Sequence, residues 1–104
     1  MLTLWQTEWC HSSQCVRQRL TEYGLDVLLR QVPADPDERI ELELRTGVTS
    51  VPVLEVGNGC LLAGAENILA WLEEHYEPGY DAAEHRKRYA ERYDPHAALP
   101  PGLR

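Results

Sequence analysis

The chain has 104 residues, of which 43% are hydrophobic, so it is long enough to fold around a single core. Seventeen acidic and ten basic residues give a net charge of −7, which argues against nucleic acid or anionic membrane as a partner because phosphates require clustered Lys and Arg. No apolar stretch is long enough for a membrane-spanning helix, and the first residues do not resemble a signal peptide. Three cysteines without framework spacing fit a reducing compartment, so we expect a cytoplasmic protein.

The first third of the sequence predicts a strand, a helix and a second strand. Apolar residues within 2–5 form a short strand, and apolar residues at helical spacing follow from Ser12. Gly24 stands where a left-handed residue would end that helix. Residues 25–32, "LDVLLRQV", favour a second strand. Because a helix separates the two strands, we expect them to be parallel neighbours joined by a right-handed crossover.

The middle of the sequence predicts a helix, a hairpin and a further helix. Asp35, Pro36 and Glu38 form a capping box, so a helix should run from there to about residue 45 and end at Gly47. "VPVLEV" and "CLLA" flank Gly57-Asn58-Gly59 and predict a β-hairpin. A last apolar pattern runs from residue 66 to about 76. Together these elements predict an α/β protein with a mixed four-stranded sheet and helices on both faces.

The last quarter differs in composition, so we predict a domain over 1–78 and a helical, Pro-rich tail over 79–104. Residues 82–93 have a helical but mostly charged pattern, and a Pro-rich stretch follows from Asp94. A charged helix of about a dozen residues is marginal alone in water. We therefore expect this helix to dock through Tyr89 and Tyr93, either on its own domain or on a second copy of the chain.

Cys10 is the candidate reactive residue, because it lies between the first strand and the first helix. Free N–H groups and the dipole at a helix N-terminus stabilise a thiolate, and the ends of parallel strands are common places for active sites. The alternative is a half-buried structural thiol. Cys15 falls inside the predicted helix, where a disulfide with Cys10 would require the first turn to unwind, so we interpret it as an incidental thiol.

Other candidate features of the sequence are individually weak. A zinc site needs four placed ligands, and only Cys10, His11 and Cys15 are close in sequence, so we expect no metal. Pro52 fits either the start of an edge strand or a cis peptide that exposes the backbone of Val51 beside Cys10. The polar residues at 66 and 67 fit helix caps, or N–H groups and a carboxylate facing the charged end of a ligand.

Taken together, these motifs resemble the glutathione-binding branch of the thioredoxin-like fold, which comprises glutaredoxins and the N-terminal domain of glutathione transferases. "WCHSSQCVRQRLTEYGL" resembles the active-site loop and helix, and "VTSVPVLEVGNGCLLAGAENILAWLEEHY" resembles the cis-proline, hairpin and final helix. The resemblance implies a monothiol C-x-x-S site, with Cys10 as nucleophile and Ser13 in place of the second cysteine. It also implies that Val51 and Pro52 hold the cysteinyl part of glutathione, and that the segment Ala65–Glu66 holds its γ-glutamyl end.

The resemblance implies a glutathione-linked thiol–disulfide oxidoreductase, with glutathione as cosubstrate and glutathionylated thiols as substrates. Glutaredoxins often carry a lysine three residues before the nucleophile, whereas this sequence has Thr7 there, followed by the acidic Glu8. The alternative function is a non-catalytic glutathione-binding or interaction module whose tail meets a second copy or another protein. Fe–S carriage is less favoured because "CHSS" is not the usual C-G-F-S, and arsenate reduction because no basic cluster surrounds the cysteine.

Overall fold

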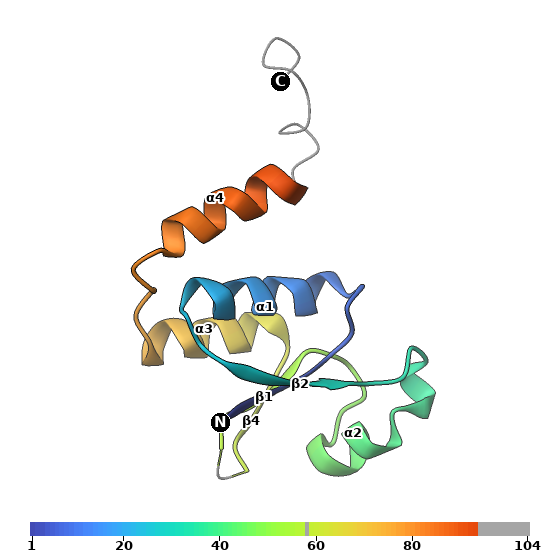
Figure 1. The fold of residues 1–104 in the computed structure, drawn as a ribbon. Helices are drawn as coiled ribbons and strands as arrows, with labels where there is room; N and C mark the ends of the chain where they lie inside the picture. Colours follow the sequence, from blue (N-terminus) through green and yellow to red (C-terminus); the bar gives the residue numbers. More distant parts are fainter. Residues whose placement is uncertain (58, 94–104) are drawn as a thin grey trace.

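The computed structural model describes residues 1–57 and 59–93, and the predicted order of strands and helices is confirmed (Figure 1). The strands are β1 (Leu2–Gln6), β2 (Val27–Gln31), β3 (Val53–Glu55) and β4 (Leu61–Ala63). The helices are α1 (His11–Glu22), α2 (Ile40–Thr46), α3 (Ala65–His75) and α4 (Ala82–Tyr93), with a 3₁₀ turn at Pro36–Glu38. In the described part of the chain no helix combines the length and apolar character needed to cross a bilayer.

The four strands form one mixed sheet in the order β2-β1-β3-β4. β1 pairs in parallel with β2, so that Leu2 lies opposite Val27, which confirms the predicted parallel neighbours. On its other side β1 pairs antiparallel with β3, and β3 pairs antiparallel with β4 in the predicted hairpin. The central position of β1 means that the residues following it emerge from the middle of the sheet.

Alternating side chains of the sheet serve two separate cores, one on each face. Leu4 and Leu54 point to the face covered by α1 and α3, and they are fully buried there. Trp5 and Val53, their neighbours in sequence, point to the opposite face and pack with Leu42 of α2. Figure 1 shows α1 and α3 on one side of the sheet and α2 on the other. Successive side chains of a strand point to opposite faces of the sheet, so both faces are apolar here and both are covered by helices, as predicted.

The segment before α2 differs from the prediction of one continuous helix. Asp35 caps its beginning as expected, because its Oδ1 accepts the N–H of Asp37 at 2.9 Å. Arg39, however, adopts φ −83° and ψ 54°, which breaks the segment into a 3₁₀ turn and α2. Its buried guanidinium donates to the backbone carbonyls of Pro33, Ala34 and Thr49, so the Arg39 side chain is directed into the protein at this break.

The C-terminal helix α4 lies against α1, on the side of α1 that faces away from the sheet (Figure 1). Arg86 of α4 pairs with the buried carboxylate of Glu22 at 2.6 Å, and the Gln18 amide donates to the His85 carbonyl at 3.3 Å. Of the two expected modes of docking, on its own domain or on a second copy, the structure shows the first, but Tyr93 remains 57% exposed and contributes less than predicted. The Pro-rich stretch from residue 94 lies outside the described residues.

Candidate functional site

The thiol of Cys10 lies at the N-terminus of α1, directly after the central strand. The Cys10 N–H donates to the carbonyl of Thr7 at 3.4 Å, which closes a turn between β1 and α1. Cys10 is the N-cap residue of the helix, and its carbonyl accepts the N–H of Gln14 at 2.9 Å. The half-buried thiol therefore faces the unpaired N–H groups of a twelve-residue helix, where a negative charge is stabilised.

Several neighbouring groups determine the charge state of this thiol. Burial by itself raises the pKa of Cys10, but the hydroxyl of Ser13 and the backbone N–H groups of Ser13 and Ser12 act in the opposite direction. The positive charge of Arg39 also lowers the pKa, and the net result is a value below that of an ordinary cysteine. A larger fraction of Cys10 is therefore the nucleophilic thiolate at neutral pH than in a free thiol.

Ser13 lies in the first turn of α1, and its side chain is completely buried. Within residues 1–57 and 59–93, its hydroxyl oxygen has no partner that satisfies ordinary hydrogen-bond geometry. Because Ser13 is three residues beyond the N-cap, its proton is available to the Cys10 thiolate, which explains its effect on the pKa. The structure therefore places Ser13 where its hydroxyl lowers the pKa of Cys10.

Arg39 is the cationic neighbour of Cys10 that the sequence analysis missed. It is 5% exposed, and its three described hydrogen bonds go to neutral carbonyls, at 2.7 Å from Pro33, 2.9 Å from Thr49 and 3.1 Å from Ala34. Its charge therefore remains available to stabilise an anion nearby. The sequence around Arg39 does not indicate that its charge acts on Cys10, because the two residues are 29 positions apart and only the fold brings Arg39 near the thiol.

Arg17 similarly changes the interpretation of Glu8, which we expected to oppose the thiolate. Arg17 Nη2 lies 3.4 Å from Glu8 Oε1, so the carboxylate beside the site has a cationic partner. The same guanidinium donates to the carbonyls of Thr7 and Glu8 at 3.3 Å and to the side chain of Gln6. Arg17 thereby holds the backbone between β1 and Cys10 in place.

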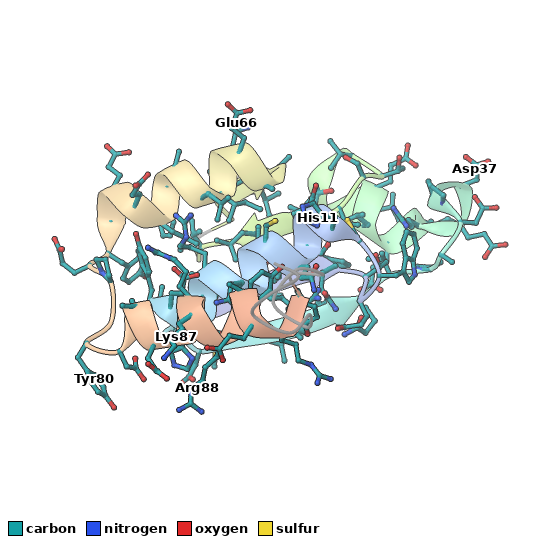
Figure 2. The ribbon with its side chains drawn as sticks, turned by 90° about the horizontal axis from the view of Figure 1, so that it is seen from above. His11, Asp37, Glu66, Tyr80, Lys87 and Arg88 are labelled. Carbon is teal, nitrogen blue, oxygen red and sulfur yellow. The ribbon has the colours of Figure 1, made fainter. Side chains whose placement is uncertain are left out.

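The proposed glutathione contacts come from two segments that the fold joins. The Val51–Pro52 peptide is cis, as expected from the resemblance, and it follows Thr49, to which Arg39 is bonded. The Pro52 carbonyl accepts the N–H of Gly64 at 3.0 Å, immediately before Ala65 begins α3. Glu66 is exposed and points outward from the first turn of α3 (Figure 2). The structure thus connects Pro52 to the start of α3, and Arg39, which binds the Thr49 carbonyl, is close enough for its charge to lower the pKa of Cys10.

Cys15 occupies the interior of α1, as predicted, one turn beyond His11. Its Sγ lies 3.6 Å from His11 Nε2, and the residue is half-buried on the side of α1 that faces α4. It lacks the free N–H groups that surround Cys10, because it is not at the helix terminus. The two thiols therefore have different environments despite their proximity in sequence.

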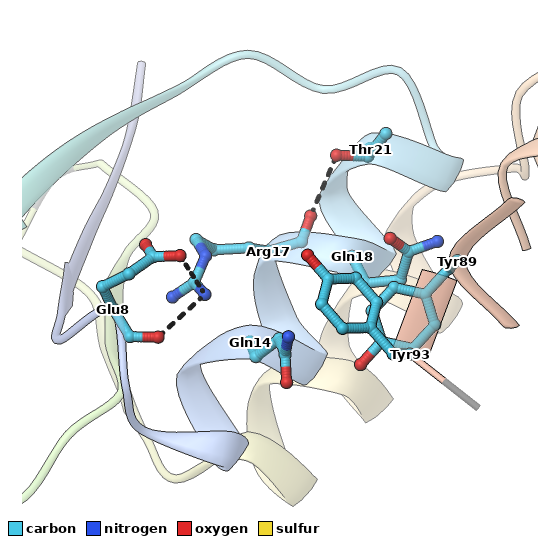
Figure 3. Close-up of a pocket in the computed structure, with 7 residues that line it drawn as sticks. All are labelled: Glu8, Gln14, Arg17, Gln18, Thr21, Tyr89 and Tyr93. Atoms are coloured by element: carbon cyan, nitrogen blue, oxygen red, sulfur yellow. Dashed lines mark hydrogen bonds and ion pairs between the residues drawn. The ribbon is translucent and has the colours of Figure 1, made fainter. Parts of the chain in front are cut away.

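A polar cavity of about 150 Å³ lies next to this site, between α1 and α4 (Figure 3). Arg17 reaches across it to Glu8, while the rings of Tyr89 and Tyr93 flank its other side with centroids 4.7 Å apart. Its lining residues are Glu8, Gln14, Arg17, Gln18, Thr21, Tyr89 and Tyr93. The cavity belongs to the contact between α1 and α4, and Cys10 does not line it.

Comparison with known proteins assigns this arrangement to a family. The family profile described as glutaredoxin matches residues 2–61, which is more than half of the chain. The chain belongs to the glutaredoxin family. The matched segment of this glutaredoxin contains Cys10, Ser13, Arg39 and the cis Pro52. A search of curated proteins gave no match.

Solved structures similar to this glutaredoxin establish its thioredoxin-like fold. A possible glutathione S-transferase from Rhodopseudomonas palustris has a TM-score of 0.64 at 21% identity, covering 88% of this chain and 51% of that one. A glutathione transferase family member from Pseudomonas fluorescens, with bound glutathione, has a TM-score of 0.68 at 23% identity, covering 86% and 47%. Human glutathione transferase theta-2, in complex with glutathione and an unknown ligand, has a TM-score of 0.62 at 21% identity, covering 70% and 30%. This glutaredoxin thus spans about half or less of each of these structures.

Proposed function

We propose that this chain is a glutathione-dependent thiol–disulfide oxidoreductase of the monothiol type, with Cys10 as its nucleophile. The observation that carries the proposal is the position of Cys10 at the N-terminus of α1, with the buried hydroxyl of Ser13 next to it and a lowered pKa. Membership of the glutaredoxin family supports the same chemistry. Ser13 stabilises the thiolate but forms no disulfide, so the site works with one thiol.

The reaction begins when the Cys10 thiolate attacks the glutathione sulfur of a glutathionylated substrate. A bond forms between Cys10 Sγ and the glutathione sulfur, the substrate disulfide breaks, and the substrate thiolate leaves and takes a proton from water. A second glutathione thiolate then attacks the glutathione sulfur of this mixed disulfide. Oxidised glutathione leaves and the Cys10 thiolate is restored, so two glutathione-derived electrons reduce one substrate disulfide.

Glutathione is held, in this proposal, between the segment of Pro52 and the start of α3. The backbone of Val51 pairs with the cysteinyl group, and the N-terminus of α3 at Ala65 and Glu66 receives the γ-glutamyl end. The hydrogen bond between Gly64 and Pro52 keeps these two segments adjacent, which supports a shared ligand. The bound glutathione described for the structures from Pseudomonas fluorescens and human theta-2 also supports this choice of ligand.

A turnover assay with full-length protein tests the proposal. Reduction of a glutathionylated peptide by glutathione should occur with the wild type, should be lost in Cys10→Ser, and should persist in the matched variant Cys15→Ser. Calorimetry with glutathione measures binding separately from turnover. Absence of glutathione binding would overturn the proposal and would favour the alternative of an interaction module.

The second candidate function is a non-catalytic glutathione-binding or interaction module. Thr7 favours it, because it stands where many glutaredoxins have a lysine. Binding of glutathione without turnover, under conditions in which Cys10 is shown to be reduced, would favour this alternative. Turnover that depends on Cys10 would exclude it.

A further inference from the structure

The edge strand β2 carries leucine side chains that stay exposed on both faces of the sheet. β2 lies at one end of the strand order, and β1 is its neighbour among the described strands. Leu28, on the face that α2 covers, is 55% exposed, and Leu29, on the face of α1 and α3, is 39% exposed. The described helices therefore leave this strand open on both faces.

The outer edge of β2 also presents backbone groups that no strand pairs with in residues 1–57 and 59–93. The N–H of Val32 donates to the carbonyl of Gln6 at 3.4 Å, so the peptide groups of even-numbered residues in β2 face β1. Peptide groups alternate in direction along a strand, so the N–H and carbonyl groups that face outward belong to Val27, Leu29 and Gln31. Proteins often protect such an edge with a proline or a lysine, and the strand sequence "VLLRQ" contains neither. The edge is therefore suited to pairing with another strand.

We propose that two copies of this chain associate through β2, which forms an antiparallel pair around a two-fold axis at Leu28. The two four-stranded sheets then become one continuous sheet. In this register Asp26 lies opposite Arg30 of the second copy, and Val27 lies opposite Leu29 of the second copy. Both contacts occur twice because the same surface serves on each copy. The interface contains no residue of the proposed glutathione site, so it does not rest on the function proposed above.

The charges at the two ends of β2 favour a second copy as the partner and select the register. Arg30 lies over the ring of Trp5 at 4.4 Å and pairs with Glu41, so its guanidinium is held on the face of α2. Asp26 is exposed, and its side chain falls on the same face, four residues before Arg30. Opposite charges that face each other across antiparallel strands stabilise the pairing. A register shifted by two residues in either direction would lose both contacts between Asp26 and Arg30.

The backbone and the leucines of β2 fit the same register. Val27 and Leu29 are outward-facing residues, so each pair of Val27 with Leu29 of the second copy can exchange two N–H···O bonds. Leu28 then meets its own counterpart in a pair without backbone bonds, in which the Cα atoms come within about 4.5 Å. The exposed side chains of Leu28 and Leu29 would be covered on both faces, and removal of apolar surface from water favours association.

Sedimentation velocity and native mass spectrometry of the full-length protein over a range of concentrations test the interface. A reductant is present, so that no disulfide through the exposed Cys60 contributes. The wild type should have twice the mass of one chain. Asp26→Lys and Arg30→Glu each place like charges opposite each other twice, so each should weaken the dimer at least about ten-fold. The control Glu73→Lys makes the same change of charge as Asp26→Lys on the exposed side of α3, and it should dimerise as the wild type does.

Mixing the two weakened variants gives the decisive measurement. In a dimer of Asp26→Lys with Arg30→Glu, the introduced lysine faces the introduced glutamate, and the native Arg30 faces the native Asp26. Both contacts are then attractive again, so the mixture should form a heterodimer under conditions in which each variant alone is a monomer. Native mass spectrometry distinguishes this heterodimer from the two homodimers by its mass. Its formation also shows that both variants are folded.

Three results would overturn the inference. The first is a wild type that stays monomeric; if removal of residues 94–104 then produced a dimer, the tail would be the occupant of the edge. The second is a dimer that persists in both Asp26→Lys and Arg30→Glu, which would place the interface elsewhere. The third is a mixture of these variants that remains monomeric, because the two positions would then not face each other.

Discussion

The guanidinium of Arg86, on the C-terminal helix α4, lies 2.6 Å from the carboxylate of Glu22, whose side chain is only 5% exposed at the end of α1. The same carboxylate oxygen accepts a second bond from Arg86 Nε at 3.2 Å, and the other oxygen accepts one from Gln18. This forked contact joins residues from opposite ends of the sequence. Helix α1 therefore carries the Cys10 thiol at its N-terminus and binds α4 near its C-terminus.

Replacing Arg86 should release α4 from α1, because Glu22 would keep a buried charge without its cationic partner. We expect Arg86→Ala to lower the free energy of unfolding. Amide hydrogen exchange across α4 should become faster than in the wild type. The matched control is Arg88→Ala, whose partner Glu84 lies on α4 itself and is exposed. That variant should lose clearly less stability than Arg86→Ala, and equal losses in the two variants would contradict the assigned role.

Arg39 should control the titration of Cys10. Burial raises the pKa of the thiol, while Ser13, the helix N–H groups and Arg39 lower it. Arg39→Met should therefore move the midpoint of the iodoacetamide rate profile to higher pH. Arg45→Met removes the same charge from an exposed position on α2 and should leave the midpoint unchanged. Identical profiles for wild type and Arg39→Met would show that Arg39 has no electrostatic effect on the thiol.

The lowered pKa also predicts how stability depends on pH. A thiol whose pKa is lower in the folded state contributes stability that is fully present above its unfolded pKa, about 8.5, and that is lost as the pH falls through the folded value. The difference in unfolding free energy between wild type and Cys10→Ser should accordingly shift in favour of the wild type as the pH rises across this window. A difference that stays constant with pH would contradict the lowered pKa.

Cys10 should react before Cys15 and Cys60 with limiting iodoacetamide near neutral pH, because Cys10 lies at a helix N-terminus and its pKa is lowered. Peptide mapping by mass spectrometry identifies the modified residue. Oxidised glutathione should produce one adduct at the same position. First labelling of Cys15, or a disulfide between Cys10 and Cys15, would mean that the nucleophile is wrongly assigned.

Ser13→Cys should convert the site to a dithiol. A residue at an N-cap and the residue three positions later have Cα atoms at about 5–6 Å, which suits a disulfide. Oxidation of this variant with glutathione disulfide should yield an intramolecular disulfide between Cys10 and the introduced thiol, seen as a loss of two hydrogens in the intact mass. The Ser12→Cys variant places the thiol on an exposed side chain and should instead accumulate glutathione adducts. The same glutathione adducts on both variants would show that the side chain at position 13 does not face Cys10.

Much of the fold could be predicted because local signals agreed with tertiary structure. Gly24 and Gly47, with φ of 67° and 79°, end α1 and α2 where the sequence placed these stops. The alternation that buries Leu4 on one face and Trp5 on the other is a property of any strand covered on both sides. These features depend on a few neighbouring residues, so sequence patterns indicate them reliably.

The features that could not be predicted depend on contacts between distant residues. Arg39 interrupts the expected helix because its guanidinium binds backbone carbonyls that precede α2 in the sequence and also that of Thr49, which follows α2. The partner of α4 was left open between its own domain and a second copy, since the pairing of Arg86 with Glu22 spans 64 positions. The place of Cys10 before α1 could be predicted from the sequence, whereas the positive charge of Arg39 that lowers its pKa could not.

The central position of β1 has a consequence for synthesis of the chain. β1 is made before its partner β3, so one of its edges remains unpaired until β3, at Val53–Glu55, has left the ribosome. A nascent chain that contains only β1, α1 and β2 therefore presents an open strand edge beside Leu4 and Trp5. Such an edge can template pairing with other chains. Fragments that end before residue 53 should consequently self-associate through this edge of β1, whereas those that include β3 and β4 should not.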